Sequence, residues 1–233
     1  AKKLLHKHKI EKLPIIDGSG RVTGLITMKD ITFKGDYPDA LRNSDGRLLV
    51  GAAVSPFDLE RAKALDKYVD VIITDVAHFH NRNCFEATKK ILKEVSAEVI
   101  VGSIGTYEAA VDCITKLDGI AGLRCGIGSG SICSTSIVTR AGAPTLYATS
   151  SAADAVKDYK ANIGIIADGG LRNPGDAALA LGIGATCVMM GNVFAGCSES
   201  PGRLVGMEGR YYKEYYGMGS VRARTKRFVQ DRY

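Results

Sequence analysis

Long apolar runs are missing from this sequence of 233 residues, in which no stretch approaches the ~18 uninterrupted apolar residues of a membrane helix. Its basic start, AKKLLHKHKIEKL, also lacks the apolar core of a signal peptide. The six cysteines form no Cys-x-x-Cys pair, and a chain of this length folds without disulfide staples. We therefore expect a soluble, intracellular, cytoplasmic protein with reduced thiols and no membrane partner.

A large excess of one charge is also absent, because 31 basic residues face 25 acidic ones and leave a net charge of +6. The excess gathers in two runs, residues 2–12 and 222–232. Neither run shows the repeated interleaving of aromatic and basic residues that a groove for single-stranded nucleic acid uses. We interpret both runs as solvated surface and predict no specific nucleic-acid partner.

Glycine, by contrast, is abundant, with 27 residues, and it closes several apolar runs that alternate with amphipathic segments. Strands are predicted at 48–54, 69–77, 98–104, 122–128, 163–170 and 186–192. Helices are predicted at 56–67, 84–95, 106–116, 152–160 and 174–182. Strands that read as continuous apolar runs are buried on both faces, and their alternation with helices indicates parallel pairing.

Two α/β folds fit this order of elements. Six strands are enough for an open, doubly wound sheet, whereas a (β/α)8 TIM barrel needs eight. The last two predicted strands end in Ala-Asp-Gly-Gly at 167–170 and Met-Met-Gly-Asn at 189–192. Barrel enzymes place a phosphate site in the loops after their last two strands, so these endings favour the TIM barrel.

The first 47 residues follow another pattern. A short basic helix is predicted over residues 2–12, and apolar runs at 13–16 and 22–26 flank an Asp-Gly-Ser-Gly turn, which indicates a hairpin. Thr27 with Asp30 has the pattern of a helix cap. Residues 34–47 are polar and predict a linker. We therefore divide the chain into a first module (1–33), this linker and a barrel domain (48–233).

The sharpest chemical motif is GIGSGSICST, residues 126–135, directly after a predicted strand. Its glycines allow the backbone to turn amides and carbonyls toward an ion, and its Cys133 falls where a barrel keeps its active site. A free cysteine is more often a small buried core residue. Its position in a glycine-serine loop favours a chemical role.

With this loop in hand, residues 48–232 resemble the inosine monophosphate dehydrogenase and GMP reductase family. The segments that carry the resemblance are LLVGAAV, GLRCGIGSGSICST, IIADGGLRNPGDAALALGIGA, VMMGNVFAGCSESPG and YYGMGS, in family order. Residues 7–31 resemble the closing half of the CBS module that this family inserts between barrel strands two and three. The resemblance therefore implies that strands three to eight are present here.

The resemblance also implies a mechanism, in which Cys133 attacks C2 of a purine nucleoside monophosphate, GMP or IMP, and the adduct exchanges hydride with a nicotinamide cofactor. A thiolate suits this step as a strong nucleophile and a workable leaving group. Thr135 matches the threonine that activates the leaving amine or the attacking water, although a capping hydroxyl is the structural alternative. Asp168 matches the residue that binds the ribose hydroxyls, and its alternative is a plain turn residue.

Further site residues are carried over from the family motifs in the same way. The phosphate cradle matches Ser131, Gly169, Gly170, Gly191, Asn192 and Tyr215, with Asn192 in place of the usual serine or glycine. Gly217, Met218 and Gly219 match the segment that contacts the base, and Asp75, Val76, Ala77, Ile127 and Gly128 match the cofactor site. The carbonyls of Gly128, Gly130 and Cys133 match a site for a monovalent cation, usually potassium.

The direction of the reaction divides the family. Asp75-Val76-Ala77-His78 resembles the reductases, although Phe79 replaces their glycine, whereas YYGMGS and the closing QDRY resemble the dehydrogenases more. We predict an NADPH-dependent GMP reductase that releases IMP and ammonia. The alternatives are an IMP dehydrogenase, which converts IMP and NAD to XMP, and a non-catalytic nucleotide sensor.

The resemblance also carries expectations about assembly and regulation. It implies a homotetramer that can pair into octamers through its CBS modules, and regulatory purine nucleotides bound at the CBS module. Thr27 and Asp30 match the Ser/Thr-x-x-Asp pattern that contacts such a nucleotide, with the helix cap as the equal alternative. A peroxisome-type organelle is a second address that the family allows.

Overall fold

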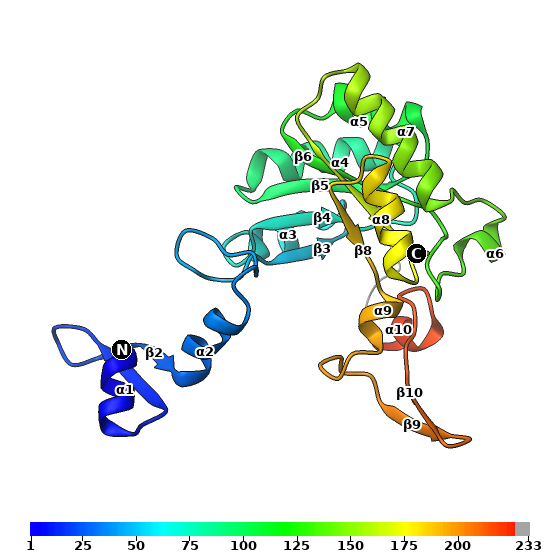
Figure 1. The fold of residues 1–233 in the computed structure, drawn as a ribbon. Coiled ribbons are helices and arrows are strands. Elements are labelled where there is room, and N and C mark those ends of the chain that lie inside the picture. Colours follow the sequence, from blue (N-terminus) through cyan, green and yellow to red (C-terminus); the bar gives the residue numbers. More distant parts are fainter. Residues whose placement is uncertain (227–233) are drawn as a thin grey trace. The chain divides into compact units, whose positions relative to one another are not determined.

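The computed structural model describes residues 1–226 and divides the chain into two compact units, Ala1–Leu49 and Val50–Tyr233. The ribbon in Figure 1 is coloured along the chain, so the first unit is the end drawn in shades of blue. Within the described residues, no helix has both the length and the apolar character needed to cross a membrane.

The first unit contains two helices and a hairpin. These elements are α1 (Lys2–His8), β1 (Lys12–Ile16), β2 (Val22–Thr27) and α2 (Met28–Asp36), with β1 and β2 antiparallel. The predicted hairpin turn forms because the Asp17 carboxylate accepts from the backbone N–H groups of Ser19 and Arg21, at 2.9 and 3.0 Å. The first helix was predicted to reach residue 12, but it ends at His8, where Lys9 takes a left-handed backbone conformation.

The predicted cap at Thr27 is present as a capping box. The Asp30 N–H donates to the Thr27 hydroxyl at 3.2 Å, and the Asp30 carboxylate accepts from the Thr27 N–H at 2.9 Å. The Thr27 hydroxyl also donates to the Asp30 carboxylate at 2.7 Å, and this bond, followed by the one from the Thr27 N–H, holds the pKa of Asp30 below its usual value. The helix that they begin runs to Asp36 and so extends into the segment predicted as a linker.

The second unit is built on six parallel strands that follow one another in chain order across one curled sheet (Figure 1). They are β3 (Gly51–Val54), β4 (Val71–Thr74), β5 (Glu98–Ile104), β6 (Ile120–Cys125), β7 (Gly164–Asp168) and β8 (Cys187–Met189). The helices between them are α3 (Leu59–Asp66), α4 (Arg82–Glu94), α5 (Tyr107–Lys116), α6 (Thr135–Thr139), α7 (Thr145–Asp158) and α8 (Pro174–Gly182). Strand order and direction confirm the TIM-barrel fold class, with strands three to eight present.

The core of this unit lies between the sheet and its helices. Ile72, Val99, Val101, Leu123 and Ile165 on the strands are almost fully buried and belong to one cluster that also contains residues of α3, α4, α5 and α7. Consecutive residues of β5 and β6 are buried on both strand faces, as their continuous apolar runs predicted, whereas β3 and β8 keep exposed residues. Side-chain caps begin α3, α4, α5 and α8; at α8, Asn173 accepts from the Asp176 N–H at 3.1 Å.

Boundaries differ from the predicted ones mainly where tertiary contacts define an element. Helix α7 begins at Thr145, seven residues before the predicted start, because the Thr145 hydroxyl bonds the carbonyls of Asp168 and Gly169. The sequence did not predict α6, α9 (Asn192–Ala195), the hairpin of β9 (Leu204–Met207) and β10 (Arg210–Lys213), or α10 (Val221–Lys226). These elements are short, and periodicity over four to six residues gives little signal.

Candidate active site

The glycine-rich loop after β6 is held in place by the segment that precedes α7. Ile127 and Ala143 exchange two backbone hydrogen bonds, at 3.0 and 2.9 Å, and the Ser129 hydroxyl donates to the Ala143 carbonyl at 3.2 Å. Gly126 has φ +123°, and a side chain there would collide with the carbonyl of Asp168. The loop therefore needs glycine at this position to pass beside the end of β7.

Cys133 lies in this loop, half-buried and without a disulfide partner. Its N–H donates to the Gly130 carbonyl at 2.9 Å, which closes a tight turn. Two other cysteines, Cys113 and Cys125, are fully buried, and burial raises the pKa of each thiol to about 12. Cys133 thus differs from these core thiols in opening onto the site.

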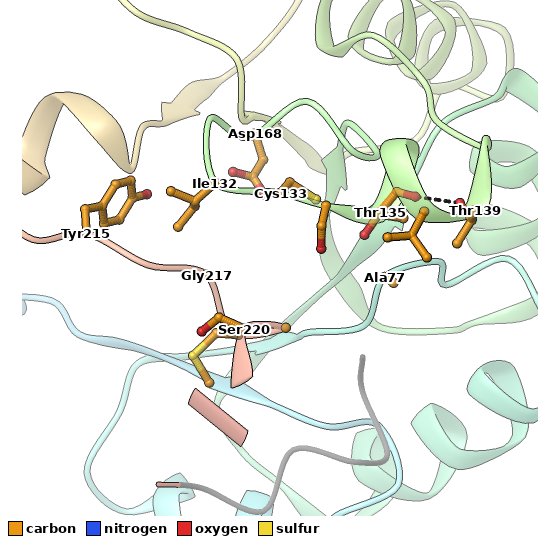
Figure 2. Close-up of a pocket in the computed structure, with 13 residues that line it drawn as sticks. Ala77, Ile132, Cys133, Thr135, Thr139, Asp168, Tyr215, Gly217 and Ser220 are labelled. Atoms are coloured by element: carbon orange, nitrogen blue, oxygen red, sulfur yellow. Dashed lines mark hydrogen bonds between the residues drawn. The ribbon is translucent and has the colours of Figure 1, made fainter. Parts of the chain in front are cut away.

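The loop faces a cavity of about 680 Å³ that brings together residues from distant parts of the chain. Figure 2 shows Ile132 and Cys133 on the loop between Tyr215 on one side and Thr135 on the other. The cavity is lined by Ala77, Ile132, Cys133, Ser134, Thr135, Val138, Thr139, Asp168, Tyr215, Gly217, Met218, Gly219 and Ser220. Seven further candidates lie outside this lining but around neighbouring cavities: Val76, Ile127, Gly128, Gly130, Gly169, Gly170 and Gly191.

Thr135 is the first residue of α6, and Ser134 occupies the N-cap position. The Thr135 carbonyl accepts from the Thr139 hydroxyl at 2.7 Å, a bond that Figure 2 marks as a dashed line. Thr135 also lines a second, smaller cavity of about 150 Å³ together with Cys133 and Asp168. This placement keeps the threonine two residues from the thiol and beside the same space.

Asp168 ends β7 and pairs with Arg124, a residue that the sequence motifs did not assign to the site. The Arg124 guanidinium donates from Nη1 to Asp168 Oδ2 at 2.6 Å and from Nη2 to Asp75 Oδ1 at 3.1 Å. Arg124 is 7% exposed. The sequence signal for this residue is its charge within the strand segment GLRCGIG. Barrel strands face either the barrel interior or the helices, and a buried strand seldom carries an arginine.

Some of the residues predicted to bind the phosphate contact one another directly. Asn192 Nδ2 donates to the Ser131 hydroxyl at 3.4 Å, so the two residues meet across 61 positions of sequence. The Tyr215 hydroxyl lies where a Gly191 side chain would be. Partial burial raises the pKa of Tyr215, and the charge of Asp168 adds to the rise. Gly169 and Gly170, with φ of +86° and +74°, pack against Ser129 and Gly130.

The residues carried over as the cofactor site come from the loops after β4 and β6. The smaller cavity is lined by Val76, Ala77, Ile127 and Gly128. Asp75 does not line it but forms an ion pair with Arg124, which does. The loop after β4 is anchored by Phe79, which is fully buried and whose N–H donates to the Ser103 carbonyl at 2.9 Å. His80 Nε2 lies 2.9 Å from Asp112 Oδ2 on α5, a contact that fits an ordinary loop histidine.

The predicted cation site consists of backbone carbonyls in the glycine loop. The Gly128 carbonyl accepts from the Ser136 hydroxyl at 3.3 Å, and the Gly130 carbonyl accepts from the Cys133 N–H. Each carbonyl oxygen has a second lone pair. Neutral carbonyls suit a weakly hydrated monovalent ion, so the donor set fits potassium chemistry.

Comparisons with known proteins agree on one family. A family model described as the IMP dehydrogenase / GMP reductase domain matches residues 4–233. Curated relatives include the inosine-5'-monophosphate dehydrogenases of Korarchaeum cryptofilum, 55% identical over 100% of this chain and 49% of that protein, and of Thermoplasma acidophilum, 48% identical over 99% and 47%.

Among solved structures, a GMP reductase variant of Trypanosoma brucei in complex with guanosine 5'-monophosphate matches with a TM-score of 0.83 at 36% identity. That match covers 96% of this chain and 47% of the reductase chain. The chain therefore spans about half the length of the curated relatives and of the solved structure that it matches.

Proposed function

Because this chain belongs to the IMP dehydrogenase/GMP reductase domain family, whose members are oxidoreductases, we propose that it carries the site for hydride transfer at C2 of a purine nucleoside monophosphate. The observation that carries the proposal is the shared cavity of about 680 Å³, where Cys133 of the glycine loop, Asp168 at the end of β7 and Tyr215 after β10 converge. A free thiol, a diol-binding carboxylate and a phenol around one space suit a nucleotide held for covalent attack.

In this proposal the Cys133 sulfur attacks C2 of the purine and forms an S–C2 bond. In the dehydrogenase direction a hydride then leaves C2, so the purine is oxidised to a thioimidate, and water breaks the S–C2 bond to give XMP. A nicotinamide cofactor bound near Val76 and Ala77 supplies the hydride acceptor, or in reduced form the donor. In the reductase direction ammonia leaves C2 of GMP first, and hydride delivery followed by loss of the thiol gives IMP.

The remaining residues bind and orient. Asp168 accepts hydrogen bonds from the ribose hydroxyls, because a carboxylate has two oxygens for a vicinal diol. Ser131, Asn192 and Tyr215 supply polar groups for the phosphate, beside the backbone of Gly169, Gly170 and Gly191. Met218 and its neighbours Gly217 and Gly219 contact the base, and Thr135 activates the leaving amine or the attacking water.

For the direction we propose IMP dehydrogenation with NAD. The curated relatives at 48–55% identity carry the name IMP dehydrogenase, whereas the reductase structure matches at 36%. GMP reduction with NADPH is the second candidate, favoured by Asp75-Val76-Ala77-His78 and by that structural match. The segment QDRY, which resembles the dehydrogenases, lies outside the described residues.

Absorbance of reduced nicotinamide tests both candidates on the complete protein. NADH accumulation from IMP and NAD, with no NADPH consumption in the presence of GMP, supports the dehydrogenase. The opposite result reverses the direction. No turnover with either pair, in a protein that still binds nucleotide, would favour the non-catalytic sensor.

We also propose that the unit Ala1–Leu49 is the closing half of a CBS module that binds a regulatory purine nucleotide. The test is calorimetry on the complete protein with Asp30→Asn. Loss of one nucleotide site supports the proposal. Unchanged binding leaves Asp30 with the helix cap only. We further propose that the protein forms a homotetramer and that tetramers pair into octamers through this unit. Sedimentation analysis of the complete protein tests both assemblies.

A further inference from the structure

Arg124 is a buried charge in a layer of the barrel that apolar side chains usually fill. It lies on β6 with 7% of its surface exposed, among residues of the apolar core. Barrel interiors are dominated by bulky branched residues, and a charged group is buried only where it is paired. The placement of this arginine therefore requires a reason beyond packing.

Its two terminal nitrogens reach carboxylates from different parts of the site. Nη1 donates to Asp168 at 2.6 Å, and Nη2 donates to Asp75 at 3.1 Å and to the Thr74 carbonyl at 3.4 Å. The Asp168 side chain is 23% exposed and the Asp75 side chain 16% exposed, so neither is fully screened by water. Without the guanidinium the two negative charges would face each other across a partly buried space and repel.

The neighbouring strand has a glycine at the point where the arginine side chain crosses it. Strand β5 lies between β4 and β6, and its Gly102 is in register with Arg124. A Cβ at Gly102 would lie 2.7 Å from the Cβ of Arg124. The Thr74 hydroxyl on β4 accepts from the Gly102 N–H at 3.1 Å, so β4 and β5 are hydrogen-bonded where the arginine side chain passes. Arg124 Nε is buried with no hydrogen-bond partner in the described part of the chain. The guanidinium is therefore oriented toward the two carboxylates although this orientation leaves one of its N–H groups without a hydrogen bond.

We propose that Arg124 is a positioning residue that couples nucleotide binding at Asp168 to cofactor binding at Asp75. The inference rests on the proposed function, which gives these two carboxylates to the two ligands. A ligand that orients one carboxylate also fixes the shared guanidinium, and through it the second carboxylate. Each ligand then lowers the ordering cost of the other site, and this coupling is reciprocal. A lysine cannot replace the arginine, because its donors sit on one atom.

The test uses the complete protein with Cys133→Ala, so that ligands bind without reacting. Calorimetry measures the dissociation constant of NAD with and without saturating IMP, or of NADPH with and without GMP if the direction is reversed. We expect the nucleotide to tighten cofactor binding at least about fivefold. With Arg124→Lys added, we expect this ratio to fall below about twofold while both ligands still bind. Arg61→Lys, on the exposed surface of α3, should leave it unchanged.

The ratio of affinities separates coupling from stability, because a general loss of folding affects both measurements alike. An unchanged ratio in Arg124→Lys overturns the inference, as does a ratio near one in the parent. If the lysine variant does not fold, Asp75→Asn is used in its place. It should bring the ratio of the two cofactor dissociation constants close to one while IMP alone binds normally. A parent protein that binds neither nucleotide refutes the proposed function and this inference together, a result distinct from uncoupled binding of both ligands.

Discussion

The Tyr215 hydroxyl occupies the space that a side chain at Gly191 would take. Gly191 precedes α9, whereas Tyr215 follows β10, so the contact joins two segments whose elements the sequence did not predict. Both residues are expected in the phosphate cradle. The glycine therefore has a steric requirement that is separate from its backbone freedom.

Replacing Gly191 with alanine should displace the Tyr215 ring from the cradle. Overpacking of this kind costs about 1–3 kcal/mol, so we expect the dissociation constant of the nucleotide to rise about tenfold or more. Calorimetry with IMP and GMP measures it. Gly196→Ala is the matched control, because a Cβ there would come no closer than 3.7 Å to the Val193 carbonyl. Equal affinity in the two variants would contradict the steric role.

Cys133→Ala should retain nucleotide binding and lose hydride transfer. Removal of a nucleophile costs about a thousandfold in turnover or more, and the alanine leaves the cavity open. Absorbance of reduced nicotinamide gives the rate, and calorimetry gives the affinity. Cys197→Ala, at an exposed cysteine, is the control and should behave as the parent does. Near-normal turnover in Cys133→Ala would remove the covalent step from the proposed mechanism.

Exchange of potassium for lithium at constant ionic strength should lower turnover severalfold. Lithium holds its water too tightly for the neutral carbonyls of Gly128 and Gly130 to replace it, and the loop that carries Cys133 would lose its cation. The protection of loop amides against hydrogen exchange should fall with the rate. Identical rates and identical protection in the two salts would argue against a cation at these carbonyls.

Asp66 should stabilise the barrel domain above the acid range. Its carboxylate accepts from the Ala97 N–H at 2.7 Å, the Ser96 hydroxyl at 2.8 Å and the Ser96 N–H at 2.9 Å. The Ala97 bond, then those of Ser96, hold the pKa of Asp66 below its usual 3.8. Because folding favours the ionised form, this contribution is present above pH 3.8 and is lost as the pH falls through the lower pKa of the folded protein.

Asp66→Asn should therefore lower the free energy of unfolding by about 1 kcal/mol near neutral pH. Urea titrations at several pH values measure the difference from the parent, which should shrink as the pH falls below 4. Glu60→Gln, on the exposed face of the same helix, controls for the loss of a negative charge. A difference that does not change with pH would show that the carboxylate charge is not its source.

Local sequence determined the elements whose signals are complete within a few residues. Strand β5 and helix α8 begin and end where they were predicted, because an unbroken apolar run and an Asn-Pro start followed by apolar helix formers need no distant partner. The turn at Asp17 and the capping box at Thr27 were also predictable, since each closes within four residues. The order of strands and helices then indicated parallel pairing and the barrel fold class.

Only the tertiary structure decided which distant residues share a site. The span of Arg124 from Asp168 to Asp75, the fit of Tyr215 against Gly191 and the early start of α7 at Thr145 each join segments separated by at least 23 positions. Periodicity and capping act over one or two turns, so they carry no information on such contacts. The contacts arise because parallel strands bring their carboxyl ends to one edge, where loops from all along the chain must pack together.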